Sequence, residues 1–219
     1  MENATNLSSS NMTQLTAINI AKALTSILLI AAAFIWGIND FRQVIYLCLH
    51  IGYCSWWLIE QWFFPERSKQ IFSEKVGGIE FIFVLLFVGI LYALPGYFAF
   101  TNPEPISYIT VAIALPLYTF GTLINTSADV QKMTAKQYNS GLVKDNIWRL
   151  SRNINYFGDI LRYLSFSIVA GSIYAYSVPG LILILYIQRM LQKEKTMLEK
   201  YPDYGEYLQK TSRFIPFIW

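Results

Sequence analysis

Residues 148–162 read W-R-L-S-R-N-I-N-Y-F-G-D-I-L-R, and they lead directly into an apolar segment at residues 164–176. This stretch gathers three arginines, two asparagines, a tyrosine and an aspartate. Polar groups this dense at the mouth of a hydrophobic span are costly unless they hold something. If the chain is helical from Ile154 onward, Asn155, Asp159 and Arg162 lie on one face, because they are four and three residues apart. The stretch therefore predicts a membrane helix that carries a polar binding face at one end.

Two features of the same stretch suit a ligand. Gly158 keeps the neighbouring face small, so that another backbone or a ligand can approach closely. The arginines at 149 and 152 match phosphate oxygens, because a guanidinium group donates two parallel hydrogen bonds. A simpler alternative remains open, in which Arg149 and Arg152 are ordinary positive charge beside a membrane and Asp159 pairs with Arg162 for structural reasons.

The composition of the chain is that of a membrane protein. Of its 219 residues, 54% are hydrophobic and 14% are charged, whereas a soluble domain usually carries about 25% charged residues. We therefore predict an all-α, multi-pass membrane helical bundle, with a polar tail at residues 1–15 and a single membrane domain at residues 16–219. No Gly-x-Gly-x-x-Gly sequence and no Walker loop occurs, so the membrane domain itself must hold any cofactor. Cys48, Cys54 and the single histidine predict neither a disulfide nor a metal site.

Apolar runs divide the chain into about six predicted transmembrane helices. Pro65 ends the second run, Val178-Pro179-Gly180 is expected to form the turn before the last, and the last helix is expected to continue into the charged residues 192–200. The first residues of the polar stretch after the fourth span, A-D-V-Q-K at residues 128–132, could likewise continue that helix into water. The predicted spans are residues 18–37, 44–64, 77–100, 106–125, 154–176 and 181–191.

Lysine and arginine set the expected orientation. Most of the 17 such residues follow the second, fourth and sixth spans, so these three segments share one face, which should be cytoplasmic. Both termini are then cytoplasmic. The membrane itself is either a bacterial inner membrane or the endoplasmic reticulum, and the net charge of +3 reflects orientation rather than binding to nucleic acid.

Polar side chains converge on that cytoplasmic side and predict a cofactor pocket covered by an ordered C-terminal tail. The pocket would admit a water-soluble reagent from below and a lipid from the side. Glu60, Glu80 and His50 lie inside predicted spans, where an ionisable residue is a functional hypothesis. The residues expected at the pocket, outside the central stretch, are Asn125, Asp129, Glu194, Tyr204, Tyr207 and Arg213.

Three blocks of sequence carry a resemblance to a known family. They are N-T-S-A-D-V-Q-K at residues 125–132, N-Y-F-G-D at residues 155–159, and the ending Y-P-D-Y-G-E-Y-L-Q-K-T-S-R-F-I-P-F-I-W at residues 201–219. Over residues 121–219 the chain resembles the C-terminal region of the steroid 5α-reductase family. Sterol C14-reductases and isoprenylcysteine carboxyl methyltransferases share this architecture. Those relatives usually read Arg-His-Pro where this chain has Arg152-Asn153-Ile154, and that departure favours the reductases.

The resemblance implies NADPH bound on the cytoplasmic side and hydride transfer to a carbon–carbon double bond conjugated to a carbonyl in a lipid. Glu60, if burial keeps it protonated, would donate to the carbonyl oxygen, and a tyrosine, with Tyr156 as the candidate, or water would protonate the α-carbon. The residues implied for the cofactor are Asn125, Asp129, Lys132, Arg149, Arg152, Asn155, Tyr156, Asp159, Arg162, Glu194, Tyr204, Tyr207 and Arg213.

Two alternatives stay open. An S-adenosylmethionine-dependent methyltransferase of a prenyl-cysteine or lipid substrate would use the same pocket, and a membrane scaffold without activity would keep only the fold. The expected partners are a lipid-soluble small molecule and membrane lipids, with no nucleic acid and no metal. A monomer is the default expectation, although the sequence leaves the oligomeric state open.

Overall fold

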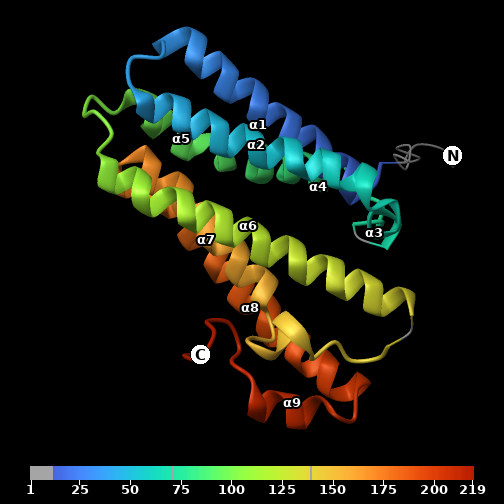
Figure 1. The fold of residues 1–219 in the computed structure, drawn as a ribbon. Helices are drawn as coiled ribbons and strands as arrows, with labels where there is room; N and C mark the ends of the chain where they lie inside the picture. Colours follow the sequence, from blue (N-terminus) through green and yellow to red (C-terminus); the bar gives the residue numbers. More distant parts are fainter. Residues whose placement is uncertain (1–11, 71, 139) are drawn as a thin grey trace, which may run out of the picture. The chain divides into compact units, whose positions relative to one another are not determined.

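A computed structural model describes residues 12–70, 72–138 and 140–219, and its regular elements are helices (Figure 1). Residues 1–11, most of the predicted polar tail, lie outside the described part. The first helix begins at Gln14, so the tail is shorter than the predicted 1–15. Residue contacts group the chain into two compact units, Met1–Pro105 (unit 1) and Ile106–Trp219 (unit 2). The single domain expected over residues 16–219 stays a prediction.

Unit 1 is built around the first helix, which packs against the π-helical segment η1 and against α2 and α5. The Asp40 side chain and the Gln43 side chain form a capping box that starts α2, because each satisfies a backbone N–H that the helix leaves unpaired. Thr25 of α1 donates to the carbonyl of Gly89 in η1 at 2.9 Å. The helices are α1 (Gln14–Trp36), α2 (Phe41–Phe63), α3 (Pro65–Gln70), α4 (Gly78–Val84), η1 (Leu85–Leu91) and α5 (Tyr92–Thr101).

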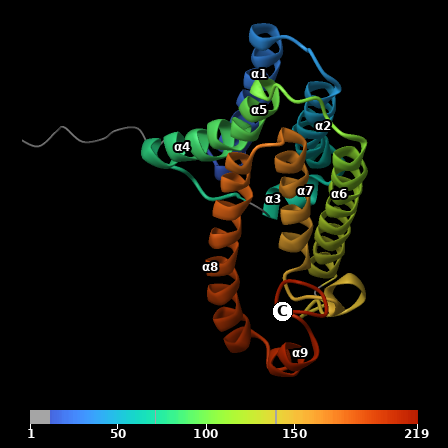
Figure 2. The same ribbon diagram turned by 90° about the vertical axis from the view of Figure 1, so that its left-hand side faces the viewer.

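Unit 2 contains the stretch quoted first. Figure 2 shows its three long helices, α6, α7 and α8, running side by side, and α7 contacts both of the others. The helices are α6 (Tyr108–Gln137), η2 (Asn146–Arg149), α7 (Ile154–Ala170), η3 (Ile173–Tyr176), α8 (Ser177–Lys200) and α9 (Tyr204–Lys210).

Two glycines bring α6 and α7 into the closest contact in unit 2. A Cβ atom added at Gly158 would lie 2.7 Å from the Gly121 carbonyl oxygen, and one added at Gly121 would lie 2.6 Å from the Gly158 carbonyl oxygen. Neither position leaves room for a side chain. The small face predicted at Gly158 therefore admits another backbone, that of α6, rather than a ligand.

Four helical segments of the described residues are long and apolar enough to cross a membrane. They coincide with the first, third, fourth and sixth predicted spans, and they support an integral membrane protein. The other two predicted spans correspond to α2 and to α7, which has 17 residues, so the count of six stays a prediction. The four segments are Gln14–Trp36, Gly78–Thr101, Tyr108–Gln137 and Ile173–Lys200.

The turn predicted at Val178-Pro179-Gly180 is wrong, because these residues lie inside α8. Proline is tolerated in the first turn of a helix, where its missing N–H would have no partner anyway. The chain instead turns at Gly171, which ends α7 with φ of 68°, a left-handed conformation that favours glycine. The predicted extensions past the fourth and sixth spans are confirmed, because α6 continues to Gln137 and α8 to Lys200.

Candidate functional site

Asn155, the first residue of the polar face predicted on α7, contacts α6. The Asn125 side chain on α6 donates through Nδ2 to the Asn155 carbonyl oxygen at 3.1 Å. The Oδ1 atom of Asn155 is buried and has no hydrogen-bond partner among the described residues, as is also true of Thr126 Oγ1. A buried acceptor without a donor costs free energy, so the α6–α7 interface holds an acceptor that suits an added N–H group.

Asp159 has partners on two helices. Arg162, 4% exposed, forms an ion pair with its Oδ1 atom, and Tyr186 on α8 donates its hydroxyl to Oδ2 at 2.9 Å. The one-face arrangement predicted for Asp159 and Arg162 is confirmed, and so is the structural i,i+3 pair that the sequence offered as the simpler alternative. Asp159 thus links α7 to α8.

Tyr186 is a member of this site that the sequence did not single out. Its ring stacks on that of Tyr156 with centroids 4.2 Å apart and an interplanar angle of 14°, and the positive charge of Arg189 acts on the Tyr156 hydroxyl. The available signal was a single phenol in the run L-I-L-I-L-Y of α8. Asp129, one helical turn beyond Asn125, acts electrostatically on Tyr156 and on Lys193.

Arg152 fixes the C-terminal tail to the helices. Its side chain is 7% exposed and donates to Glu194 of α8 through Nε at 3.2 Å and Nη2 at 3.0 Å. It also donates to the carbonyl oxygens of Leu208 and Thr211. Arg213 donates to both Glu194 oxygens at 3.0 Å. Two guanidinium groups therefore share one carboxylate, and the predicted order of the tail has a physical cause.

Trp148 anchors a second set of predicted residues. Its indole N–H donates to the Ala128 carbonyl at 3.2 Å, and its own carbonyl accepts from the Tyr207 hydroxyl at 2.5 Å. The ammonium groups of Lys132 and Lys193 lie 5.8 Å and 5.6 Å from its ring centroid, within the range of a cation–π interaction.

The two predicted tail tyrosines are buried rather than displayed on a surface. Burial raises the pKa of Tyr207, and the neighbouring Tyr204 raises it further. Burial also raises the pKa of Tyr204. Both phenols therefore stay neutral at physiological pH, and their rings meet edge to face at 5.9 Å, which packs α9 together.

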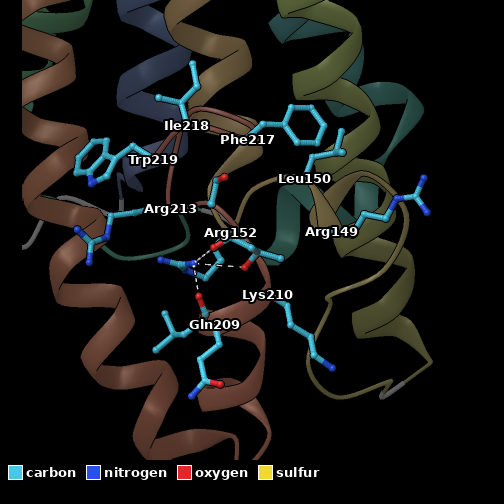
Figure 3. Close-up of a pocket in the computed structure, with 12 residues that line it drawn as sticks. Arg149, Leu150, Arg152, Gln209, Lys210, Arg213, Phe217, Ile218 and Trp219 are labelled. Atoms are coloured by element: carbon cyan, nitrogen blue, oxygen red, sulfur yellow. Dashed lines mark hydrogen bonds between the residues drawn. The ribbon is translucent and has the colours of Figure 1, made fainter.

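A cavity of about 550 Å³ lies between the Arg149–Arg152 region and the tail. Figure 3 shows Arg152 near its centre, Arg149 and Lys210 on one side, and Arg213 and Trp219 on the other. Three of the residues predicted to hold the cofactor, Arg149, Arg152 and Arg213, line this cavity. Asn155 and Asp159 lie elsewhere, because Asn155 contacts α6 and Asp159 contacts α8.

Glu60 belongs to unit 1 and is 5% exposed. Arg67 forms an ion pair with its Oε2 atom at 3.2 Å. A guanidinium at this distance favours a charged carboxylate, whereas the donor role suggested for Glu60 requires a protonated one. His50, also in unit 1, shares a hydrogen bond of 2.9 Å with the Tyr46 hydroxyl on its own helix.

Comparison with known sequences gives the chain a family. A family model described as "Protein of unknown function (DUF1295)" matches residues 5–211. The chain belongs to the DUF1295 family. A Delta(14)-sterol reductase from Arabidopsis thaliana is 23% identical over 193 residues, covering 79% of this chain and 52% of the plant protein. This DUF1295 chain thus spans about half the length of that curated relative.

The distant homology to a sterol reductase agrees with the wider superfamily that the sequence blocks resemble. The closer likeness to 5α-reductases stays a prediction. The DUF1295 structure brings together Asn125, Asn155, Tyr156, Asp159 and Arg162 on adjoining faces of α6, α7 and α8. It gathers six further predicted residues around the tail, and these are Arg149, Arg152, Glu194, Tyr204, Tyr207 and Arg213. The remaining two, Asp129 and Lys132, lie on α6.

Proposed function

We propose that this DUF1295 protein is a membrane-embedded reductase. It would use NADPH to reduce a carbon–carbon double bond conjugated to a carbonyl in a steroid-like, isoprenoid or enoyl lipid. The homology to a sterol reductase and the four apolar helices support a membrane reductase that acts on a lipid. The observation that carries the proposal is the buried Oδ1 atom of Asn155, which has no donor among the described residues and sits in the block that resembles a reductase motif.

The residues of this face suit a nicotinamide dinucleotide. A carboxamide N–H would satisfy Asn155 Oδ1, and a buried acceptor gains most when it finds its missing donor. Asp159 accepts from Arg162 and Tyr186, but a carboxylate has about four acceptor sites, so it can also accept from a ribose hydroxyl. Lys132, whose ammonium lies beside Trp148, would offer a cation to the phosphates. Asp129, on the same face as Asn125, would hold Lys193 in place electrostatically.

The tail residues would act indirectly. Arg152, Glu194 and Arg213 hold the tail against α8, and the buried tyrosines 204 and 207 pack α9. Together they would keep water from the α6–α7–α8 face, which strengthens the electrostatic interactions inside it. Arg149, Arg152 and Arg213 themselves line the tail cavity, so Lys132 is the better candidate for the cofactor phosphates.

Bound NADPH supplies a hydride, and the protein orients the reactants and provides a proton. Of the two catalytic candidates, Tyr156 fits the proton donor better than Glu60. The positive charge of Arg189 acts on the Tyr156 hydroxyl and would stabilise the phenolate that remains once the proton has left. Glu60 is paired with Arg67, and a carboxylate cannot donate. We therefore assign the proton delivered to the α-carbon to Tyr156 Oη.

Ligand-dependent thermal unfolding tests the cofactor. The detergent-purified protein is heated with NADPH, NADH or S-adenosylmethionine, and a ligand present at a hundred times its dissociation constant stabilises the native state by about 2.7 kcal/mol. For a chain of this size that corresponds to a rise in melting temperature of roughly 5–10 °C. Stabilisation by S-adenosylmethionine alone would replace the reductase with a methyltransferase.

Two matched variants test the residue assignment. Asn155→Ala should lose NADPH stabilisation while the ligand-free protein melts no lower, because the deleted Oδ1 atom makes no hydrogen bond within the described residues. Thr122→Val removes another unpartnered buried oxygen of α6 that we do not assign to the cofactor, and it should keep NADPH binding. Equal NADPH affinity in Asn155→Ala and wild type would refute the assignment.

A further inference from the structure

The open cavity beside the tail has a basic lining. Four of its twelve lining residues carry positive charge and none carries negative charge, while Thr211, Ser212 and Gln209 add hydroxyl and amide donors. Glu194 pairs with Arg152 and Arg213 and Glu206 pairs with Lys210, so four basic side chains face two acidic ones and a net positive charge remains. The basic residues are Arg149, Arg152, Lys210 and Arg213.

The cavity lies level with the end of an apolar helix. Arg213 binds Glu194 at 3.0 Å, and Glu194 follows Leu191 by one turn, where the apolar part of α8 gives way to the charged residues 192–200. A membrane span that ends there places Glu194 and Arg213 at the depth of the lipid headgroups. Basic side chains at this depth meet phosphate groups rather than hydrocarbon.

Large apolar side chains stand beside the basic ones. Phe217 is 85% exposed and Ile218 is 80% exposed. The turn that presents them is fixed, because the backbone N–H groups of Phe214 and Ile215 donate to the Trp219 oxygen at 2.6 Å and 2.7 Å. In Figure 3 both side chains project above the level of Arg152. Exposed apolar residues next to a polar rim mark a surface that contacts an apolar partner.

We propose that this cavity binds the headgroup of an anionic phospholipid. The phosphate is held by Arg149 and Lys210 at the rim, while Arg152 and Arg213 stay bound to Glu194, and Phe217 and Ile218 contact the first part of the acyl chains. A basic pocket bordered by apolar side chains at headgroup depth has the chemistry of a lipid site. The lipid would fasten the tail to the membrane that its own helices span, independently of the reductase activity.

A phosphate could also come from the dinucleotide, since guanidinium groups bind either source equally well. The exposed Phe217 and Ile218 favour the phospholipid, because the charged and hydroxyl-rich surface of a dinucleotide gains little from two aliphatic or phenyl contacts. The test must therefore separate an acyl-bearing phosphate from a soluble one.

The experiment measures thermal unfolding of the full chain in a neutral detergent during titration with dioctanoyl phosphatidylglycerol. Dioctanoyl phosphatidylcholine and inorganic phosphate are titrated in parallel. The phosphatidylglycerol should raise the melting temperature, and the other two should not. Arg149→Gln combined with Lys210→Gln should weaken the affinity for phosphatidylglycerol, read from the titration midpoint, by about fivefold for each charge removed.

Two further variants complete the test. Lys195→Gln combined with Lys200→Gln removes the same charge from exposed positions on α8 outside the cavity, and it should leave the response unchanged. Phe217→Ser combined with Ile218→Ser should weaken it without altering charge, and this variant serves if the Arg149/Lys210 double variant does not fold.

Three results would each overturn the proposal. The first is an equal response to phosphatidylcholine, and the second is an equal loss in the Lys195/Lys200 control. The third is loss of the phosphatidylglycerol response in saturating NADPH, which would show that the cofactor occupies the cavity. Binding of NADPH that depends on Asn155 is scored separately, so either proposal can fail alone.

Discussion

Replacing Gly158 with alanine should destabilise unit 2 through the contact of α6 with α7. The new Cβ atom would lie 2.7 Å from the Gly121 carbonyl oxygen and 2.9 Å from the Asn125 backbone nitrogen. Ordinary van der Waals contact begins near 3.4 Å, and both obstructing atoms belong to a helix backbone that cannot rotate away. The two helices must therefore move apart along the most extensive interface in unit 2.

The expected loss of stability in Gly158→Ala is the difference between two opposing effects. Overpacking of this kind costs about 1–3 kcal/mol, and the upper end applies because a gap of under 1 Å already forfeits a quarter to a half of each dispersion contact. Alanine gains about 1 kcal/mol over glycine in helix propensity. The net loss is about 2 kcal/mol, which corresponds to a fall of roughly 4–8 °C in melting temperature for a chain of this size.

Tryptophan fluorescence of the detergent-purified protein measures the melting temperature. Gly205→Ala in α9 is the matched control, because no atom lies within 4 Å of its added Cβ, and it should melt at or above the wild-type temperature. Gly121→Ala should resemble Gly158→Ala, and the double variant should lose less than the sum, because one separation of the helices relieves both clashes. A Gly158→Ala protein that melts with the wild type would refute the reasoning.

Two other substitutions probe the links between α8 and its neighbours. Glu194→Gln removes the carboxylate shared by Arg152 and Arg213, and breaking a buried ion pair costs about 3–5 kcal/mol. The tail should then detach more often, so trypsin should cleave after Arg213 much faster than in the wild type. Unchanged protection of the tail would contradict this expectation. Tyr186→Phe removes the hydroxyl that donates to Asp159 and should cost about 1.5–3 kcal/mol, read as a lower melting temperature. Tyr186→Leu should cost about 0.5–1.5 kcal/mol more through the lost ring stack, and equal melting of the two variants would show that the stack contributes nothing.

Much of the helical architecture could be predicted from apolar runs, but the breaks between them could not. The extension of α6 past Asn125 follows from residues that keep a helical pattern in water, and it is confirmed. Pro179-Gly180 has the composition of a turn, yet Pro179 occupies the first turn of α8 and the break falls at Gly171. A proline before a helix and a proline in its first turn look alike in sequence, because both dispense with the N–H.

The π-helical segment Leu85–Leu91 was also beyond the reach of the sequence. It lies inside an apolar run that reads as one continuous span. Thr25 of α1 donates to the carbonyl oxygens of Val88 and Gly89 in this segment. This contact joins residues more than 60 positions apart, so no local pattern in the sequence predicts it.

The contacts of the site within one helix could be predicted from the sequence, whereas its contacts between helices could not. The spacing of Asp159 and Arg162 is a property of α7 alone, and their ion pair is confirmed. Tyr186 reaches Asp159 only because α8 returns beside α7, 27 positions later in the chain. Arg152 suggested a phosphate ligand by residue type, whereas its donors are directed at Glu194 and at carbonyl oxygens of the tail.

Polar residues at the end of a membrane helix can therefore serve the fold and a ligand within one stretch. In residues 148–162, Arg152 holds the tail and Arg162 holds Asp159, so these charges are compensated inside the protein. Asn155 differs, because its Oδ1 atom is buried without a donor among the described residues, and Arg149 differs because it is exposed at the cavity rim. Since an uncompensated buried group is costly to keep, the acceptor of Asn155 is a stronger sign of a ligand than the density of charge around it. The same reasoning separates the two proposed ligands, because Asn155 requires a donor such as an amide N–H, and Arg149 requires an anion.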